Sequence, residues 1–260
     1  MPDSAHEQHD GDAVLTYVLV HGGGATGRFW DRLLPYLDRP SVAVDLPGRN
    51  GKAADLATLT VDEEVAAVLA DIEAARVPGP LVLVAHSSGG LVVPGVVAAL
   101  SDRVEHVVLS AALVPPEGGC GLDCMQPRHA DGLRLAAEQA ARNGTVITLP
   151  GPPDDPESMR AAYGGDPLDD DALAFVVDPV RFVPDTVHHY FQPVRWSAAA
   201  EVPVTYIINA RDRPIPPALQ EEMAGRMPQT ASRVHLESGH LPAVTMPAAF
   251  ADRLRSSGTG

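Results

Sequence analysis

The segment AHSSGG at residues 85–90 constrains this chain more than any other feature, because an apolar run ends directly at it. Residues 81–85 are apolar throughout, which favours a strand buried on both faces of a parallel sheet. A helical pattern follows over residues 87–100. A strand joined to a helix by a sharp turn with small flanking residues is the arrangement called a nucleophile elbow. The sequence therefore predicts Ser87 at the apex of a strand–turn–helix unit.

Further apolar runs alternate with helical patterns along the chain. The expected strands cover residues 14–20, 42–45, 81–85, 104–109, 204–209 and 233–236. The expected helices cover residues 29–37, 61–76, 87–100, 217–227 and 247–255. Strands that alternate with helices imply right-handed crossovers. The predicted fold class is therefore α/β, with a mostly parallel, doubly wound sheet of about six strands.

The alternation breaks once, between residues 114 and 200. This stretch is rich in Pro, Gly and Asp, with helical patches at 130–142 and 179–191. It is too long for a plain loop, and we predict a cap insertion over the edge where open α/β sheets bind ligands. Residues 14–113 and 201–256 then form the core, and residues 1–13 form a disordered tail.

Composition narrows the classes of partner. The formal net charge of −15 disfavours nucleic acid and anionic membrane surfaces. The N-terminus lacks the blocks of a signal peptide, and no apolar run approaches the roughly 18 residues of a membrane helix. We expect a cytoplasmic protein that acts on a small-molecule substrate, with homodimer formation left open. Cys120 and Cys124 are interpreted as free thiols, with a local disulfide as the alternative.

Ser87 has two competing interpretations. A serine where a strand enters a helix is often only an N-cap, whereas the elbow pattern makes it a nucleophile. Ser88 is the rival nucleophile, but the small residues Ala85 and Gly89 frame Ser87 symmetrically. We predict Ser87 as the nucleophile.

The first strand ends in HGGG at residues 21–24, where glycines leave the backbone free to aim amide groups at a carbonyl oxygen. A tetrahedral oxyanion needs two such donors. We assign them to the amides of Gly23 and Ser88. The alternatives are a plain Gly-rich turn or a phosphate-binding loop. Against a phosphate-binding loop, the lysine of a P-loop is missing, and the glycine spacing G-x-G-x-x-G fits only when its starting glycine is chosen to suit it.

An acid and a base follow at two later strand ends, Asp212 after residues 204–209 and His240 after residues 233–236. Ends of parallel strands converge at one sheet edge, and the order Ser, Asp, His is that of a known catalytic triad. The alternatives are a salt bridge of Asp212 with Arg211 or Arg213, and a loop or capping role for His240. Weaker candidates are His188 and His189 for substrate contact, Asp45 for ordering its turn, and His21 and His86 for supporting loops.

These motifs resemble the α/β-hydrolase superfamily, and most of all its branch of small esterases, plant methylesterases and hydroxynitrile lyases. The resemblance rests on HGGG (21–24) with Trp30 downstream, DLPG (45–48), AHSSGG (85–90), NARD (209–212) and GHLP (239–242). It implies the triad Ser87, Asp212 and His240, the oxyanion donors Gly23 and Ser88, and neither cofactor nor metal.

Departures from the family pattern bear on the reaction. Ala85 and Asn209 stand where glycine is frequent, and Leu241 and Gly22 stand where cyanohydrin-cleaving members have lysine and threonine. Dehalogenases and epoxide hydrolases use an aspartate nucleophile, unlike Ser87. The resemblance thus favours hydrolysis of a carboxylic ester of a small to medium apolar substrate through an acyl-enzyme. The alternatives are a thioesterase, lactonase, C–C hydrolase or lyase, or a non-catalytic ligand receptor.

Overall fold

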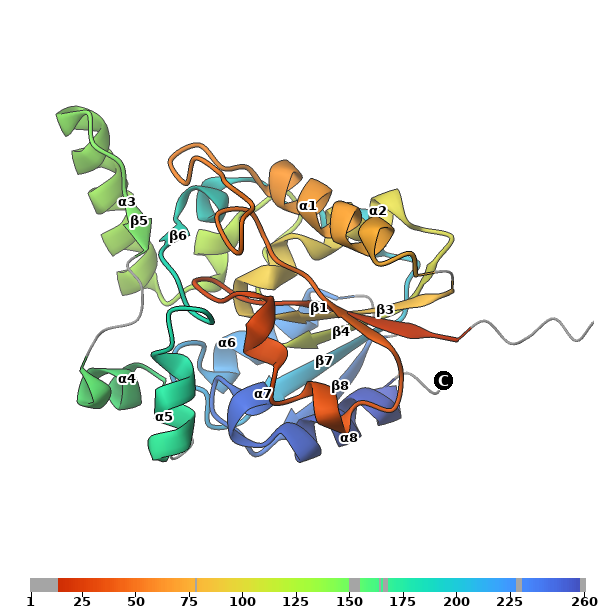
Figure 1. Cartoon of the computed structure of the whole chain (residues 1–260). Helices are drawn as coiled ribbons and strands as arrows, with labels where there is room; N and C mark the ends of the chain where they lie inside the picture. Colours follow the sequence, from red (N-terminus) through yellow and green to blue (C-terminus); the bar gives the residue numbers. More distant parts are fainter. Residues whose placement is uncertain are drawn as a thin grey trace, which may run out of the picture.

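The centre of the molecule is a six-stranded sheet in the order β2-β1-β3-β4-β7-β8, in which every neighbouring pair is parallel (Figure 1). The computed structural model describes residues 14–77, 79–149, 155–163, 165, 168–227 and 231–257, so the predicted tail 1–13 lies outside the described residues. The predicted α/β class and strand number are confirmed. The strands are β1 Thr16–Val20, β2 Ser41–Ala43, β3 Leu81–His86, β4 Val104–Ser110, β7 Val204–Asn209 and β8 Ser232–Leu236.

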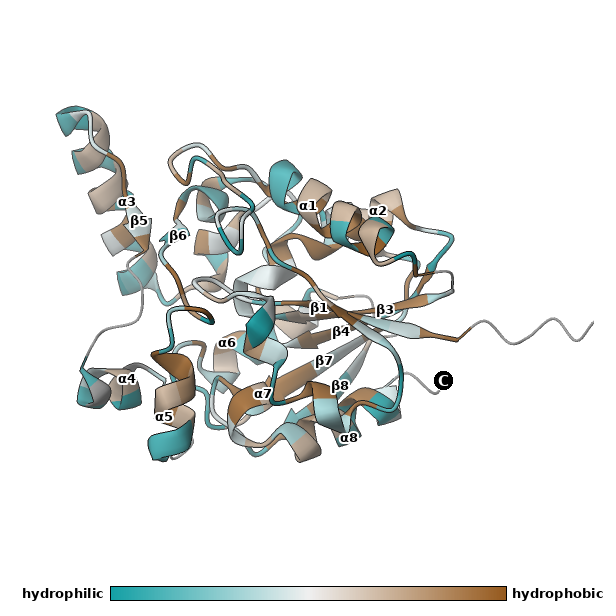
Figure 2. Ribbon diagram, viewed as in Figure 1, coloured by the Kyte–Doolittle hydropathy of each residue, from teal (hydrophilic) through white to brown (hydrophobic). Residues whose placement is uncertain are grey.

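The inner strands β1, β3 and β7 are buried along their whole length because helices cover the sheet on both sides, whereas the edge strands β2 and β8 are partly exposed. In β1, Val18 and Val20 join one core cluster, while Tyr17 and Leu19 join the other. Figure 2 shows the strands as a hydrophobic layer between helices of mixed polarity. One side carries α1 Val61–Ala74, α2 Val93–Ala99 and α6 Pro217–Gly225, and the other carries the 3₁₀ turn η1 Gly27–Trp30, α7 Pro242–Thr245 and α8 Pro247–Ser257.

Two predicted helices are shorter and tighter than expected. The range 29–37 forms two 3₁₀ turns, η1 and η2 Leu34–Tyr36, because Pro35 lacks the amide that would continue an α-helix. The range 87–100 begins as the 3₁₀ turn η3 Ser87–Leu91, and α2 starts only where Pro94 occupies its first turn. The elbow is therefore followed by a tight turn before the helix proper.

Residues 114–200 lie between β4 and β7, and those of them that the structure describes contribute no strand to the main sheet. They include α3 Pro127–Asn143, which projects from the body in Figure 1, α4 Pro156–Ala162 and α5 Asp170–Val176. The predicted helix at 179–191 is wrong. That range holds β6 Asp185–Thr186, paired antiparallel with β5 Thr148–Leu149, and the 3₁₀ turn η5 His188–Phe191. Pro184 explains this, because it forces the residue before it out of the helical region.

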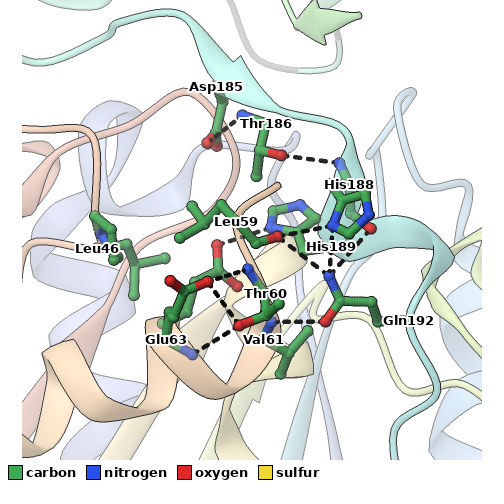
Figure 3. Close-up of polar contacts among 12 residues, drawn as sticks. Leu46, Leu59, Thr60, Val61, Glu63, Asp185, Thr186, His188, His189 and Gln192 are labelled. Carbon is green, nitrogen blue, oxygen red and sulfur yellow. Dashed lines mark hydrogen bonds and ion pairs between the residues drawn. The ribbon is translucent and has the colours of Figure 1, made fainter. Parts of the chain in front are cut away.

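Local contacts tie this segment to α1. The helix begins with the predicted capping box, in which the Glu63 amide donates to the Thr60 hydroxyl and the Thr60 amide donates to the Glu63 carboxylate. Figure 3 shows the Gln192 side chain accepting from the amide of Val61 at the same helix end. The start of α1 is therefore held both by its own residues and by Gln192 of the segment between β4 and β7.

Cys120 and Cys124 are free thiols, as predicted. Burial raises the pKa of the Cys124 thiol to about 12, which keeps it protonated and unreactive at neutral pH. Within the described residues, no helix combines the length and apolar character that crossing a bilayer requires. The cytoplasmic location and the absence of nucleic-acid and membrane partners stay predictions of the sequence.

Candidate active site

Ser87 lies on the sharp turn between β3 and η3, as the elbow pattern predicted. Its φ of +52° is left-handed, a conformation that a non-glycine residue adopts only when its surroundings hold it there. The turn needs close packing: a Cβ on Gly89 would lie 2.6 Å from the carbonyl oxygen of His21. Gly89 therefore lets the elbow press against the end of β1, where the HGGG segment starts.

A cavity of about 220 Å³ opens at this edge of the sheet, and Ser87, His240 and Gly23 all line it. Ser88, the rival nucleophile, is only 3% exposed and is not among the residues that line the described cavity. The structure thus brings the predicted nucleophile, base and one oxyanion donor to one cavity. The predicted second donor, the amide of Ser88, belongs to the residue directly after Ser87.

Asp212 and His240 form a buried pair at the ends of β7 and β8. His240 Nδ1 lies 2.7 Å from Asp212 Oδ2, and both side chains are almost fully buried. The other carboxylate oxygen of Asp212 accepts the amide of Ile215 at 2.8 Å, which fixes the carboxylate plane. A carboxylate on Nδ1 leaves Nε2 of the imidazole as the nitrogen available to a substrate or a nucleophile.

His86 supports the loop that carries His240. Its Nε2 donates to the backbone carbonyl of His240 at 2.8 Å. Burial, helped by the neighbouring His240, lowers the pKa of His86 to about 3, so this ring stays neutral at ordinary pH. His86 therefore acts through the position of His240 rather than by moving a proton.

His21 orients the peptide group that precedes Gly23. The amide of Leu46 donates to His21 Nε2, so Nδ1 carries the hydrogen and donates to the carbonyl of Gly22 at 2.8 Å. Burial and the nearby charge of Arg49 hold the pKa of His21 well below 6.5, which keeps the ring neutral. In a planar trans peptide the N–H points opposite to the C=O. The amide of Gly23 is therefore turned away from His21.

The remaining sequence candidates lie away from the cavity. His189 is buried and contacts Glu64, and His188 contacts the carbonyl of Leu59; neither lines the described cavity. Asp45 accepts the amide of Gly27 and the side chain of Asn50, so it orders its own turn as expected.

Sequence reasoning did not identify which residues of the stretch 114–200 line the cavity. Leu149, Tyr163, Phe182 and Tyr190 line the cavity from this segment, and the Tyr163 ring stacks on His240 with centroids 6.2 Å apart. Aromatic residues scattered through a Pro- and Gly-rich stretch carry no periodic signal, so no pattern in the sequence could have found them.

A family model described as the alpha/beta hydrolase family matches residues 17–253. This chain belongs to the alpha/beta hydrolase family. It is 36% identical over 142 residues to lipase LipV of Mycobacterium tuberculosis, a match that covers 52% of this chain and 54% of LipV. The chain spans about half or less of the first curated relatives it matches, namely 54%, 42% and 38% of their lengths.

Solved structures of hydrolases share this fold. The pyrethroid hydrolase from Sphingobium faniae superimposes with a TM-score of 0.73 at 22% identity, covering 94% of this chain and 96% of that protein. Methylesterase MES16 from Arabidopsis superimposes with a TM-score of 0.68 at 20% identity, covering 94% and 98%. The predicted resemblance to the α/β-hydrolase superfamily is confirmed by the family model, and the solved structures show the same fold.

The low pKa of His86 predicts a stability that falls in mild acid. The unfolded histidine takes up a proton near pH 6.5, whereas the folded one does so only near pH 3, so stability present above pH 6.5 is lost as the pH falls. Between pH 6.5 and 5, His86→Gln should make the free energy of unfolding less pH-dependent by about 1 kcal/mol per pH unit. Urea denaturation at several pH values measures this slope. The exposed His129→Gln is the control; an unchanged slope in His86→Gln would contradict the neutral buried state.

Proposed function

We propose that this hydrolase cleaves a carboxylic ester of a small to medium apolar substrate, with Ser87 as nucleophile, His240 as base and Asp212 as the supporting acid. The observation that carries the proposal is the buried 2.7 Å contact between His240 and Asp212, beside a cavity lined by both His240 and Ser87. A base held by a carboxylate next to a strained serine is the arrangement that activates a hydroxyl for attack.

In the proposed first step, His240 takes the proton of the Ser87 hydroxyl as the oxygen attacks the ester carbonyl. The negative charge that develops on the carbonyl oxygen is bound by the amides of Gly23 and Ser88. The C–O bond to the alcohol then breaks, and His240 gives its proton to the departing oxygen. Water, deprotonated by His240, attacks the acyl-enzyme in the second step, which releases the acid and restores Ser87.

Asp212 has two roles in this scheme. Its Oδ2 on Nδ1 of His240 selects the tautomer whose Nε2 is free to accept a proton, and its negative charge stabilises the imidazolium that forms. The burial of the pair strengthens this interaction, because little water screens it.

The cavity wall supports an uncharged, compact substrate. Phe29, Phe182 and Leu149 contribute apolar surface, and the lining residues that the structure describes include no Lys, Arg, Asp or Glu. A volume of about 220 Å³ lies below the roughly 300–1,000 Å³ of pockets that hold drug-sized ligands. We therefore propose short acyl or compact aryl esters as the best substrates.

Named relatives support ester chemistry over the alternatives. LipV is named a lipase, and another relative, from Methylococcus capsulatus, is named a methyl ester esterase. Leu241, next to His240, is an apolar part of the cavity wall and offers no cation for a cyanide leaving group. A thioesterase, lactonase or C–C hydrolase would use the same residues, so substrate panels must separate these reactions.

Labelling with a fluorophosphonate probe tests the nucleophile. The serine oxygen displaces fluoride from phosphorus, so wild-type protein and Ser88→Ala should be labelled and Ser87→Ala should not. In-gel fluorescence of the purified proteins measures the outcome. Labelling that survives Ser87→Ala and disappears in Ser88→Ala would assign the nucleophile to Ser88, and absence of both labelling and ester turnover would favour a receptor.

Replacement of the acid tests its role in setting the tautomer. Asp212→Asn should keep the fold and lower kcat about 10⁴-fold, because the amide no longer holds the imidazole in the productive tautomer. Steady-state hydrolysis of p-nitrophenyl butyrate measures the change. Glu237→Gln, on the exposed part of the loop that leads to His240, is the matched control and should leave kcat unchanged. Equal effects of the two substitutions would exclude Asp212 from the triad.

The cavity size predicts a preference for short acyl chains. Wild-type protein should hydrolyse p-nitrophenyl acetate and butyrate with higher kcat/KM than the decanoate, because the longer chain exceeds the cavity. Leu149→Ala removes part of the wall and should shift the preference toward longer chains, whereas Leu135→Ala on exposed α3 should not. A decanoate preference in the wild type would refute the compact-substrate proposal.

A further inference from the structure

A buried ion pair contacts the backbone at the end of the HGGG segment and has no role in the proposed acyl transfer. Arg49 Nη2 and Asp185 Oδ2 are 2.5 Å apart, with side chains only 1% and 0% exposed. Arg49 follows the DLPG turn after β2, whereas Asp185 begins β6 in the segment between β4 and β7. The pair therefore joins the sheet edge to the segment that supplies part of the cavity wall.

Stability alone is a poor explanation for such a pair. Removing two charges from water costs several kcal/mol per ion, and apolar residues of similar volume often replace a buried pair without loss of stability. A pair that contributes little net stability is best explained by what it holds in place. The backbone atoms that it contacts identify that target.

Asp185 holds the residue after Gly23. Its Oδ2 accepts the amide of Gly24 at 2.7 Å, in addition to its contact with Arg49. Its Oδ1 accepts the amide of Thr186 at 2.8 Å, a bond that Figure 3 shows and that fixes the carboxylate plane. One carboxylate oxygen is thus held by the backbone of its own strand, and the other binds the backbone of the HGGG segment.

Arg49 holds Ala25, the residue directly after the HGGG segment. Its Nε donates to the carbonyl of Ala25 at 2.6 Å, and its Nη1 donates to the carbonyl of Pro47 at 2.6 Å. The backbone of residues 180–183 runs along the same stretch, since the amide of Val183 donates to the carbonyl of Gly24. Both members of the ion pair therefore contact the backbone directly after Gly23.

These contacts complete the orientation of Gly23. His21 fixes the peptide group before Gly23 through the carbonyl of Gly22, and Asp185 fixes the peptide group after it through the amide of Gly24. A residue between two fixed peptide planes has little freedom left in φ and ψ. Amide donors that already point at the oxyanion position before the reaction begins stabilise the developing charge without any rearrangement of the protein.

We propose that Asp185, held by Arg49, is a positioning residue that aims the amide of Gly23 at the oxyanion. This inference rests on the proposed ester hydrolysis at Ser87. It assigns to the segment between β4 and β7 a role in the chemical step, in addition to its role in shaping the cavity.

A matched pair of variants isolates the acceptor for Gly24. R49Q/D185N removes both charges but keeps an amide oxygen at position 185, whereas R49Q/D185A also removes that oxygen. R49Q/D185N should retain kcat within about fivefold, and R49Q/D185A should lose about 10- to 100-fold in kcat with little change in KM, since a misaimed oxyanion donor acts on the transition state. The pH dependence of kcat/KM should not move, because His240 is untouched.

A second buried pair supplies the control. His189 Nδ1 lies 2.8 Å from Glu64 Oε1, and both side chains are about as buried as the first pair. Among the described residues, no hydrogen bond joins either side chain to the HGGG segment. E64Q/H189Q should therefore change thermal stability without changing kcat. Circular dichroism melts and p-nitrophenyl butyrate kinetics on all variants separate folding from catalysis.

Several results would overturn the proposal. Full kcat in R49Q/D185A, an effect on KM alone, or an equal loss of kcat in E64Q/H189Q would each reduce the pair to a structural contact. If R49Q/D185A does not fold, R49M/D185L takes its place, because it fills the space with apolar side chains but offers no oxygen to Gly24: a 10- to 100-fold loss in kcat supports positioning, and full kcat refutes it. Absence of ester turnover by wild-type protein would count against the proposed function, whereas normal wild-type turnover with an unimpaired R49Q/D185A counts only against positioning.

Discussion

The close packing of the Ser87 turn against the end of β1 is the constraint on which the site depends. With no side chain at Gly89, the turn after β3 approaches the carbonyl oxygen of His21 closely enough that a single Cβ would clash at 2.6 Å. This contact brings the HGGG segment to Ser87, and the neighbouring strand ends then bring Asp212 and His240 to the same edge of the sheet. A looser turn would separate the serine from the segment that is proposed to bind the oxyanion.

Buried polar groups around this contact are held by partners far away in the sequence. His86 reaches the carbonyl of His240 across 154 positions, and Asp185 accepts the amide of Gly24 across 161 positions. Because a buried polar atom without a partner is costly, each of these bonds ties the position of one loop to that of another. The site is therefore a property of several loops that meet at one sheet edge, and the segment between β4 and β7 is one of them.

Sequence patterns predicted the elements whose burial is regular and missed those set by local chemistry. The apolar runs over β3 and β7 correspond to buried strands, because both faces of a parallel sheet are covered. The helix predicted at 179–191 is wrong, because Pro184 disfavours helical backbone at the residue before it. Asp185 instead belongs to β6, which pairs with β5. Tyr163 and Tyr190 line the cavity without any periodic signal that could have indicated it.

By itself, the sequence determined the fold class and the identity of the residues proposed for catalysis, because Ser87, Asp212 and His240 each follow an apolar strand and parallel strands end at a common edge. The tertiary structure decided what surrounds them. Contacts between segments more than a hundred positions apart determine the size and aromatic wall of the cavity. They also form the Arg49–Asp185 pair, which contacts the backbone directly after Gly23. Short-range patterns encode burial and turns, whereas the partners of a buried charge are fixed only when the chain has folded.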